Sequence, residues 1–161
     1  MTSIVERARE RVRGTGARVT GPRVRVLATL MRTDEALSHA ELQSRLAAAE
    51  EADLLDRVTL YRVLEWLTET GLVHRVSGPD RVWRFSSHGG GHAARAHHGH
   101  FKCRSCERMF CMKESGSLAR TVRAMLPSGF EGDEVELTVV GLCPACAAAA
   151  RPRSTATAAA G

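Results

Sequence analysis

Apolar side chains recur at helical spacing near the start of the chain and predict two helices there. Residues 4–13 fit a short, highly charged helix. A second helix is expected to begin after Gly21-Pro22, since proline is favoured in the first helical turn. Its apolar positions follow the i, i+3, i+4, i+7 pattern and are Val24, Leu27, Ala28 and Met31.

Two further helices are marked by their ends as well as by their apolar stripes. Ser38 followed by Glu41 is the pattern of a capping box, which starts a third helix. A fourth stripe occupies about residues 59–70, and Gly71 is suited to end it as the residue after the C-cap. The first seventy residues are therefore expected to be helical.

The pattern changes to short strands after the fourth helix. Residues 72–76 and 81–85 flank Ser77–Asp80, a turn sequence containing glycine and proline, and predict a β-hairpin. Helices followed by a hairpin suggest a winged helix, a DNA-binding architecture whose last helix enters the major groove. In that arrangement residues 59–70 form the recognition helix and the hairpin forms the wing.

A second, smaller domain is expected beyond a linker rich in glycine, histidine, alanine and serine. Strand-like segments lie near Phe101 and at 109–112, a helix covers about 118–126, and alternation around Val135–Val139 predicts a half-buried strand. The predicted fold class is α+β: an N-terminal winged helix, then a small α/β domain, for which the cysteines below predict a structural zinc site and the family resemblance below implies a role in dimerisation. The expected divisions are 1–85 for the winged helix, 86–99 for the hinge, 100–146 for the second domain and 147–161 for a disordered tail.

Charge suggests an anionic partner for the first lobe. The chain carries a net charge of +5, and residues 1–33 contain eight arginines against Glu6 and Glu10. Contact with nucleic-acid phosphates would explain this bias, although a solvated arginine-rich helix would give the same pattern. No stretch approaches the roughly 18 apolar residues of a membrane span, and the N-terminus has no apolar signal segment. We therefore expect a cytoplasmic protein without a membrane partner.

Four of the five cysteines form two Cys-x-x-Cys pairs. Cys103 and Cys106 make one pair, and Cys143 and Cys146 make the other. Four thiolates in two chelating pairs match a tetrahedral structural zinc site, which would join the last strand of the small domain to the first. Redox pairs or buried free thiols are the alternative, but neither pair follows a strand at the start of a helix as thioredoxin-like pairs do.

A histidine cluster precedes the first cysteine pair. In an extended segment the side chains alternate, so His98 and His100 would share one face while His97 and Cys103 share the other. Two metal sites could diverge from this segment. A loosely solvated histidine-rich loop is the alternative, and His97 has no assigned role.

These motifs together resemble the ferric uptake regulator (Fur) family of metal-responsive repressors. The resemblance rests on His-His-x-His-x-x-Cys-x-x-Cys at 97–106, the distal Cys-x-x-Cys, Thr59–Leu64 and Arg18–Arg23, and it covers about residues 15–146. It implies a homodimer with an N-terminal winged helix, a C-terminal dimerisation domain and a metal site at the hinge. The zinc uptake regulator (Zur) branch is the most similar.

The resemblance also implies a regulatory metal site. His74 stands where zinc-sensing members place a ligand from the wing, and Cys111 stands where the family often has glutamate, so the implied set is His74, His98, His100 and Cys111. A thiolate favours zinc over ferrous iron. Ser86 and Ser87 occupy the position of a further cysteine ligand in zinc sensors, and His88 or His92 could replace it. The implied cofactors are one structural and one regulatory zinc ion per chain.

The implied function is zinc-responsive repression of metal-uptake genes. Zinc would close the hinge and favour binding to a pseudo-palindromic double-stranded operator. The resemblance assigns Tyr61 and Arg62 to base contacts, with Thr59 nearby and Arg18 and Arg23 on phosphates.

Other functions remain to be weighed against this one. Regulators of the same family sense iron, nickel or peroxide with the same scaffold. A zinc-ribbon module that binds protein is an alternative from another class. The chain lacks the His-Glu-x-x-His and His-x-Glu/Pro-Cys-x-x-Cys motifs of zinc hydrolases and deaminases, so we expect neither an enzyme nor a small-molecule substrate.

Overall fold

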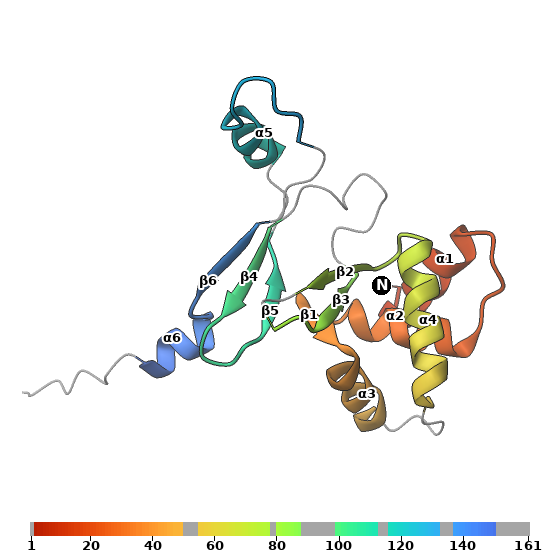
Figure 1. The fold of residues 1–161 in the computed structure, drawn as a ribbon. Helices are drawn as coiled ribbons and strands as arrows, with labels where there is room; N and C mark the ends of the chain where they lie inside the picture. Colours follow the sequence, from red (N-terminus) through yellow and green to blue (C-terminus); the bar gives the residue numbers. More distant parts are fainter. Residues whose placement is uncertain are drawn as a thin grey trace, which may run out of the picture.

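The computed structural model describes residues 2–49, 55–77, 80–87, 99–112, 116–132 and 137–150. The first half contains α1 (Ile4–Gly14), α2 (Gly21–Leu30), β1 (Glu35–Ser38), α3 (His39–Ala48), α4 (Arg57–Glu69), β2 (His74–Ser77) and β3 (Trp83–Ser86). The second half contains β4 (His100–Cys103), β5 (Met109–Cys111), α5 (Gly116–Ala124), β6 (Thr138–Gly141) and α6 (Pro144–Ala150). Figure 1 shows α1 to α4 at one end, β4 to β6 at the other, and the short strands β1 to β3 between them.

Helices α3 and α4 begin where the sequence provides a side-chain cap. The predicted capping box is confirmed: the Ser38 hydroxyl accepts from the Glu41 backbone N–H, and the Glu41 carboxylate accepts from the Ser38 N–H at 2.7 Å. At the start of α4, the Asp56 carboxylate accepts from the Thr59 backbone N–H at 2.9 Å. Gly71 follows the end of α4 with a φ of +74°, a conformation that glycine adopts without steric cost.

The main hydrophobic core belongs to the first half. Helix α2 packs against α1 and α4, and the side chains that meet there are almost completely buried. They include Val26, Leu27, Leu30, Leu60, Leu64 and Leu67. Burying one such side chain stabilises the folded state by about 1.5–3 kcal/mol. The first half of the chain therefore has a hydrophobic core of its own.

One sheet runs through both halves. Its strand order is β2-β3-β1-β5-β4-β6, so the wing strands continue into the strands of the small domain. The junction is the antiparallel pair β1–β5, in which Glu35 pairs with Phe110 and Ala36 with Met109. Sequence analysis did not predict β1, which has only four residues and lies directly before α3.

The predicted wing is confirmed as a hairpin, with each strand beginning two residues later than expected. Strand β2 pairs with β3 in antiparallel register, so that His74 faces Ser86 and Val76 faces Arg84. The Arg84 guanidinium donates two hydrogen bonds to the Asp80 carboxylate, at 2.7 and 2.9 Å. Asp80 also accepts from the Val82 backbone N–H.

The C-terminal part departs from the prediction in two places. Residues 147–150 continue α6 instead of starting a disordered tail, because alanine has the highest helix propensity and the Ala147 N–H finds the Cys143 carbonyl at 2.8 Å. Residues 151–161 lie outside the described part. In β6, Val139 and Val140 are 40% and 58% exposed, so the expected half-buried strand is not buried within one chain.

None of the described helices has the length and apolar character needed to cross a membrane.

Candidate metal centres

The four paired cysteines converge at the end of the sheet farthest from the wing. Cys103 ends β4, Cys106 follows in the next turn, Cys143 comes after β6, and Cys146 lies in α6. The expectation that neither pair follows a strand at the start of a helix is therefore wrong for Cys143 and Cys146. Their sulfur atoms all lie within 4.8 Å of one another. The parallel pairing of β4 with β6, which aligns Cys103 with Gly141, brings the two Cys-x-x-Cys segments together.

Backbone amides make this cluster suited to negative sulfur. The backbone N–H groups of Cys106 and Cys143 lower the pKa of Cys103 to about 6, and the Cys143 N–H lies 3.4 Å from that sulfur. The Arg108 guanidinium lowers the pKa of Cys106 in the same way. The Ser105 hydroxyl favours the Cys146 thiolate, but the neighbouring Cys143 and Cys106 sulfurs outweigh it and raise the pKa of Cys146 to about 11. Four clustered sulfurs of this kind fit a structural zinc ion.

Few apolar side chains are buried in the described part of the small domain. Among described residues 99–150, the buried apolar side chains are Cys103, Met109 and Cys143. A core of this size cannot offset the conformational entropy of folding without a staple such as a metal ion or a partner chain. The four-cysteine cluster therefore stands where the fold needs a cross-link.

A second donor cluster lies at the junction of the two halves. His74 begins β2 in the wing, whereas His100 begins β4 and Cys111 ends β5 in the small domain. The antiparallel pairing of β4 with β5 sets His100 opposite Cys111. Cys111 Sγ lies 3.5 Å from His74 Nε2, the two imidazole centroids are 5.9 Å apart, and one donor atom from each residue falls within 4.8 Å of the others.

The surroundings of this second cluster are buried and polar. Burial raises the pKa of the Cys111 thiol, the Ser86 hydroxyl opposes that effect, and the nearby Asp34 carboxylate adds to it. His74 is 6% exposed and Ser86 is fully buried. Two imidazoles and a thiol suit zinc or another borderline divalent ion, which would provide the charge that a buried thiolate needs.

Three of the four residues in the implied regulatory set are thus brought together. His98 lies outside the described residues, as do His88, His92 and His97. The structure also brings Ser86 to this cluster, a residue that the sequence showed only as a departure from the family pattern. Ser86 pairs with His74 across the hairpin, and its hydroxyl hydrogen-bonds to Cys111.

Three of the residues implied for DNA contact, Thr59, Tyr61 and Arg62, lie near the start of α4. Tyr61 and Arg62 have exposed side chains, with Tyr61 48% exposed, while Thr59 is half-buried. Thr59 is held by the N-cap, because both its backbone N–H and its hydroxyl donate to Asp56. Tyr61 is therefore not a core aromatic, since about half of its side chain is exposed.

Two contacts around these residues had no signal in the sequence. The His39 ring stacks on Tyr61, with centroids 3.9 Å apart and planes inclined by 20°. The Arg23 guanidinium lies 3.7 Å above the Trp66 ring and donates to the Arg18 carbonyl at 2.7 Å. Arg23 is therefore held against α4, and its contact with phosphate stays a prediction.

A winged helix whose wing shares a cluster of metal donors with a second domain defines a class of metal-responsive DNA-binding regulators. The ferric uptake regulator family model matches residues 14–140, and the chain belongs to that family. The predicted fold class and resemblance are confirmed by this match and by the structural neighbours below. Members of the family are transcription regulators, so the chain is a metal-binding and DNA-binding regulator and not an enzyme.

Similar proteins include ferric and zinc uptake regulators. Transcriptional regulator FurA of Mycobacterium tuberculosis is 34% identical over 155 residues, which cover 96% of this chain and 99% of the relative. The Vibrio cholerae ferric uptake regulator has a TM-score of 0.61 at 23% identity, with 83% of this chain and 98% of that one covered. A zinc uptake regulator solved with zinc and DNA has a TM-score of 0.61 at 24% identity, covering 92% and 98%. At these identities the two solved structures show the shared fold.

Proposed function

We propose that the protein is a zinc-responsive transcriptional repressor of metal-uptake genes. In this proposal Cys103, Cys106, Cys143 and Cys146 hold a structural zinc ion. His74, His100 and Cys111 hold a regulatory zinc ion together with a fourth ligand from the histidine-rich segment, for which His98 is our first choice and His88 or His92 the alternatives.

The contact between His74 and Cys111 carries the proposal. The two residues come from different halves of the chain, and their donor atoms are 3.5 Å apart. A ligand shifts a conformational equilibrium only when it has different affinities for the two states. Bound zinc would supply a single centre that all these donors ligate at once. When the wing and β5 are apart, the chain cannot present all of these donors to one ion. Zinc binding should therefore favour the angle between the wing and the small domain that is seen here.

Zinc is preferred to the other ions that the family senses because of the thiol. Cys111 contributes sulfur, a soft donor, beside two imidazoles, and this mixture suits zinc better than ferrous or manganous ions. The buried surroundings of Cys111 favour a bound divalent ion in general, since its thiolate needs a nearby positive charge. Sensing of iron, nickel or peroxide is the alternative within the family.

The operator-binding form is proposed to be a cytoplasmic homodimer. Family members bind DNA as dimers, and this chain leaves Val139 and Val140 exposed on β6, the last strand of the sheet. Phe130 in the same half is 68% exposed. Burying these side chains against a second copy would place two α4 helices in successive major grooves of a pseudo-palindromic operator.

The proposal is tested by operator binding in buffered solutions of zinc, iron(II), nickel and manganese. Zinc should tighten binding to a palindromic operator by about 10-fold or more, as expected for an ordinary allosteric coupling. His74→Ala and Cys111→Ser should lose that response. A response to iron or nickel that exceeds the zinc response would favour the alternative, and a full zinc response in both variants would exclude this site as the sensor.

A further inference from the structure

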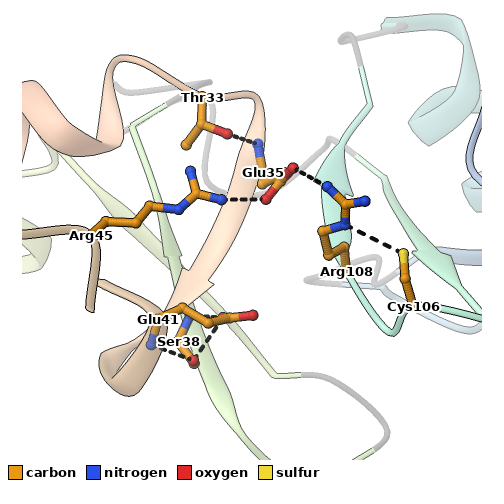
Figure 2. A network of polar contacts seen from close by, with 7 residues as sticks. All are labelled: Thr33, Glu35, Ser38, Glu41, Arg45, Cys106 and Arg108. Carbon is orange, nitrogen blue, oxygen red and sulfur yellow. Dashed lines mark hydrogen bonds and ion pairs between the residues drawn. The ribbon is translucent and has the colours of Figure 1, made fainter. Parts of the chain in front are cut away.

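A chain of polar contacts links the four-cysteine cluster to the winged helix. The Arg108 guanidinium donates to Cys106 Sγ at 3.4 Å and to a Glu35 carboxylate oxygen at 3.1 Å. The other Glu35 oxygen accepts from Arg45 at 2.6 Å. Figure 2 shows the Glu35 carboxylate between the two guanidinium groups, with the sulfur on the far side of Arg108.

Each member of this chain is fixed by a different element. Arg45 belongs to α3, and Glu35 is the first residue of β1, where its backbone N–H donates to the Thr33 hydroxyl. Arg108 precedes β5 in the small domain. Glu35 is the least exposed partner, with 15% of its side chain accessible, against 44% for Arg108 and 41% for Arg45.

The same place holds the backbone junction of the two halves. Glu35 pairs with Phe110 in the β1–β5 ladder, and the Cys111 N–H donates to the Asp34 carbonyl at 3.3 Å. Beneath the ladder, Ala36, Val76 and Met109 form a small buried cluster with members from both halves. The ion pair therefore closes a junction that also sets the position of Cys111.

We propose that Arg108 and Glu35 form a clasp that holds the winged helix against the zinc-binding domain and so positions Cys111 beside His74. Both are positioning residues: neither is within the regulatory donor set. Glu35 carries the clasp into the winged helix through Arg45, and Arg108 anchors it to the four-cysteine loop through Cys106. Loosening the clasp should increase local opening of the β1–β5 ladder while the zinc-holding cluster stays intact.

The expected effect is modest because two of the three side chains are partly exposed. A single ion pair between partly exposed side chains contributes little free energy. This corresponds to a change of roughly two- to fivefold in the equilibrium constant for opening of the junction. The shared carboxylate places this pair toward the upper end of that range. The change should be confined to the junction and to properties that depend on it.

The experiment uses the full-length protein with its structural zinc and without added regulatory metal. Amide hydrogen exchange at Met109 and Cys111, whose backbone N–H groups face β1, should quicken roughly two- to fivefold in Glu35→Gln and in Arg108→Gln. The double variant should show less than the product of the single effects, since both remove one interaction. Arg104→Gln is the matched control, because it removes the same charge from the same cysteine loop without touching Glu35.

Zinc content and operator binding separate the possible results. Glu35→Gln should keep all of its structural zinc and weaken metal-dependent operator binding by a factor similar to the exchange effect. Unchanged exchange in Glu35→Gln, or an equal change in Arg104→Gln, would overturn the clasp. Loss of zinc in Arg108→Gln with no effect of Glu35→Gln would also overturn it, since Arg108 would then only support the cysteine cluster.

The operator measurement rests on the proposed function, whereas the exchange measurement does not. If the wild type shows no metal-dependent operator binding, the proposed function fails. Faster exchange in both clasp variants would still establish the clasp in that case.

Discussion

His74 Nε2 and Cys111 Sγ lie 3.5 Å apart although 37 positions separate them in the chain. His74 lies in the wing, and Cys111 is the last residue of β5. This contact joins the two halves to each other and does not lie inside either half. Its loss should therefore remove a metal ion without unfolding the protein. Cys111→Ser and His74→Ala are therefore expected to hold about one zinc ion per chain where the wild type holds about two.

Metal analysis after dialysis against buffered zinc measures this difference. The control is Met112→Ser, which changes the residue that follows Cys111. The Met112 side chain is partly exposed, so this variant should keep both zinc ions. Two firmly held ions in Cys111→Ser would contradict the assignment of the thiol as a ligand.

Removing a cysteine of the other cluster should have a structural effect. Cys143→Ser removes from the cluster the sulfur that follows β6, which lies 3.8 Å from Cys106 Sγ, and the described part of the small domain has few other buried side chains to replace it. Hydrogen exchange in β4, β6 and α6 should lose protection on this change or on chelation of zinc. The α2–α4 core should stay protected, since Leu27 and Leu64 pack independently of the cluster. Equal loss of protection in both halves would show that the winged helix also depends on the metal.

Much of this fold could be predicted because its signals are local. The capping box of Ser38 and Glu41, the stripe ending at Gly71 and the two Cys-x-x-Cys pairs each specify their structure within a few residues. Family resemblance added His74 and Cys111, whose proximity no local pattern contains. It could do so only because motifs far apart in the chain were considered together.

The unpredicted features depend on contacts between distant segments. Strand β1 has four residues and no clear alternation, and it becomes a strand because β3 and β5 pair with its two edges. Arg108 looks like an ordinary charge two residues after Cys106, and its partner Glu35 is 73 positions away. The exposure of Val139 also follows from the strand order, which places β6 at the edge of the sheet.

The wing should be sensitive to acid through the pair of Asp80 and Arg84. The Arg84 guanidinium holds the pKa of Asp80 well below its ordinary value, and Arg84 is itself only 8% exposed in its side chain. A carboxyl whose pKa is depressed by folding contributes stability above its unfolded pKa of about 3.9, and that contribution is lost as the pH falls further. Asp80→Asn should therefore destabilise the protein by about 1 kcal/mol at pH 7.

Urea unfolding of the wild type and Asp80→Asn at pH 7 and pH 3 tests this prediction. The difference between the two free energies of unfolding should shrink at pH 3, where Asp80 in the unfolded wild type is protonated. Acid also releases zinc from both proteins, so only the difference between them is informative. A difference that stays constant with pH would mean that the amide loses packing or a turn hydrogen bond and not an ion pair.

The stack of His39 on Tyr61 should matter for operator recognition. His39 begins α3, and burial lowers the pKa of its imidazole. A hydrogen bond to the Arg57 backbone opposes this effect, and repulsion from the Arg57 charge adds to it. The lowered pKa favours the neutral form of the ring, which covers one face of an aromatic side chain that is otherwise half exposed. Without it, Tyr61 would sample more rotamers, and binding would have to restrict them again.

His39→Ala should weaken binding to a specific operator by about 2- to 10-fold, the range expected for an aromatic pair, and leave binding to a scrambled duplex unchanged. His39→Phe keeps a ring of similar size at the same place and should restore most of the affinity. Fluorescence anisotropy with both duplexes at one salt concentration measures the two affinities. If His39→Phe were as weak as His39→Ala, the hydrogen bond to Arg57 would be the important contact and the stack incidental; if both bound like the wild type, Tyr61 would be positioned by α4 alone.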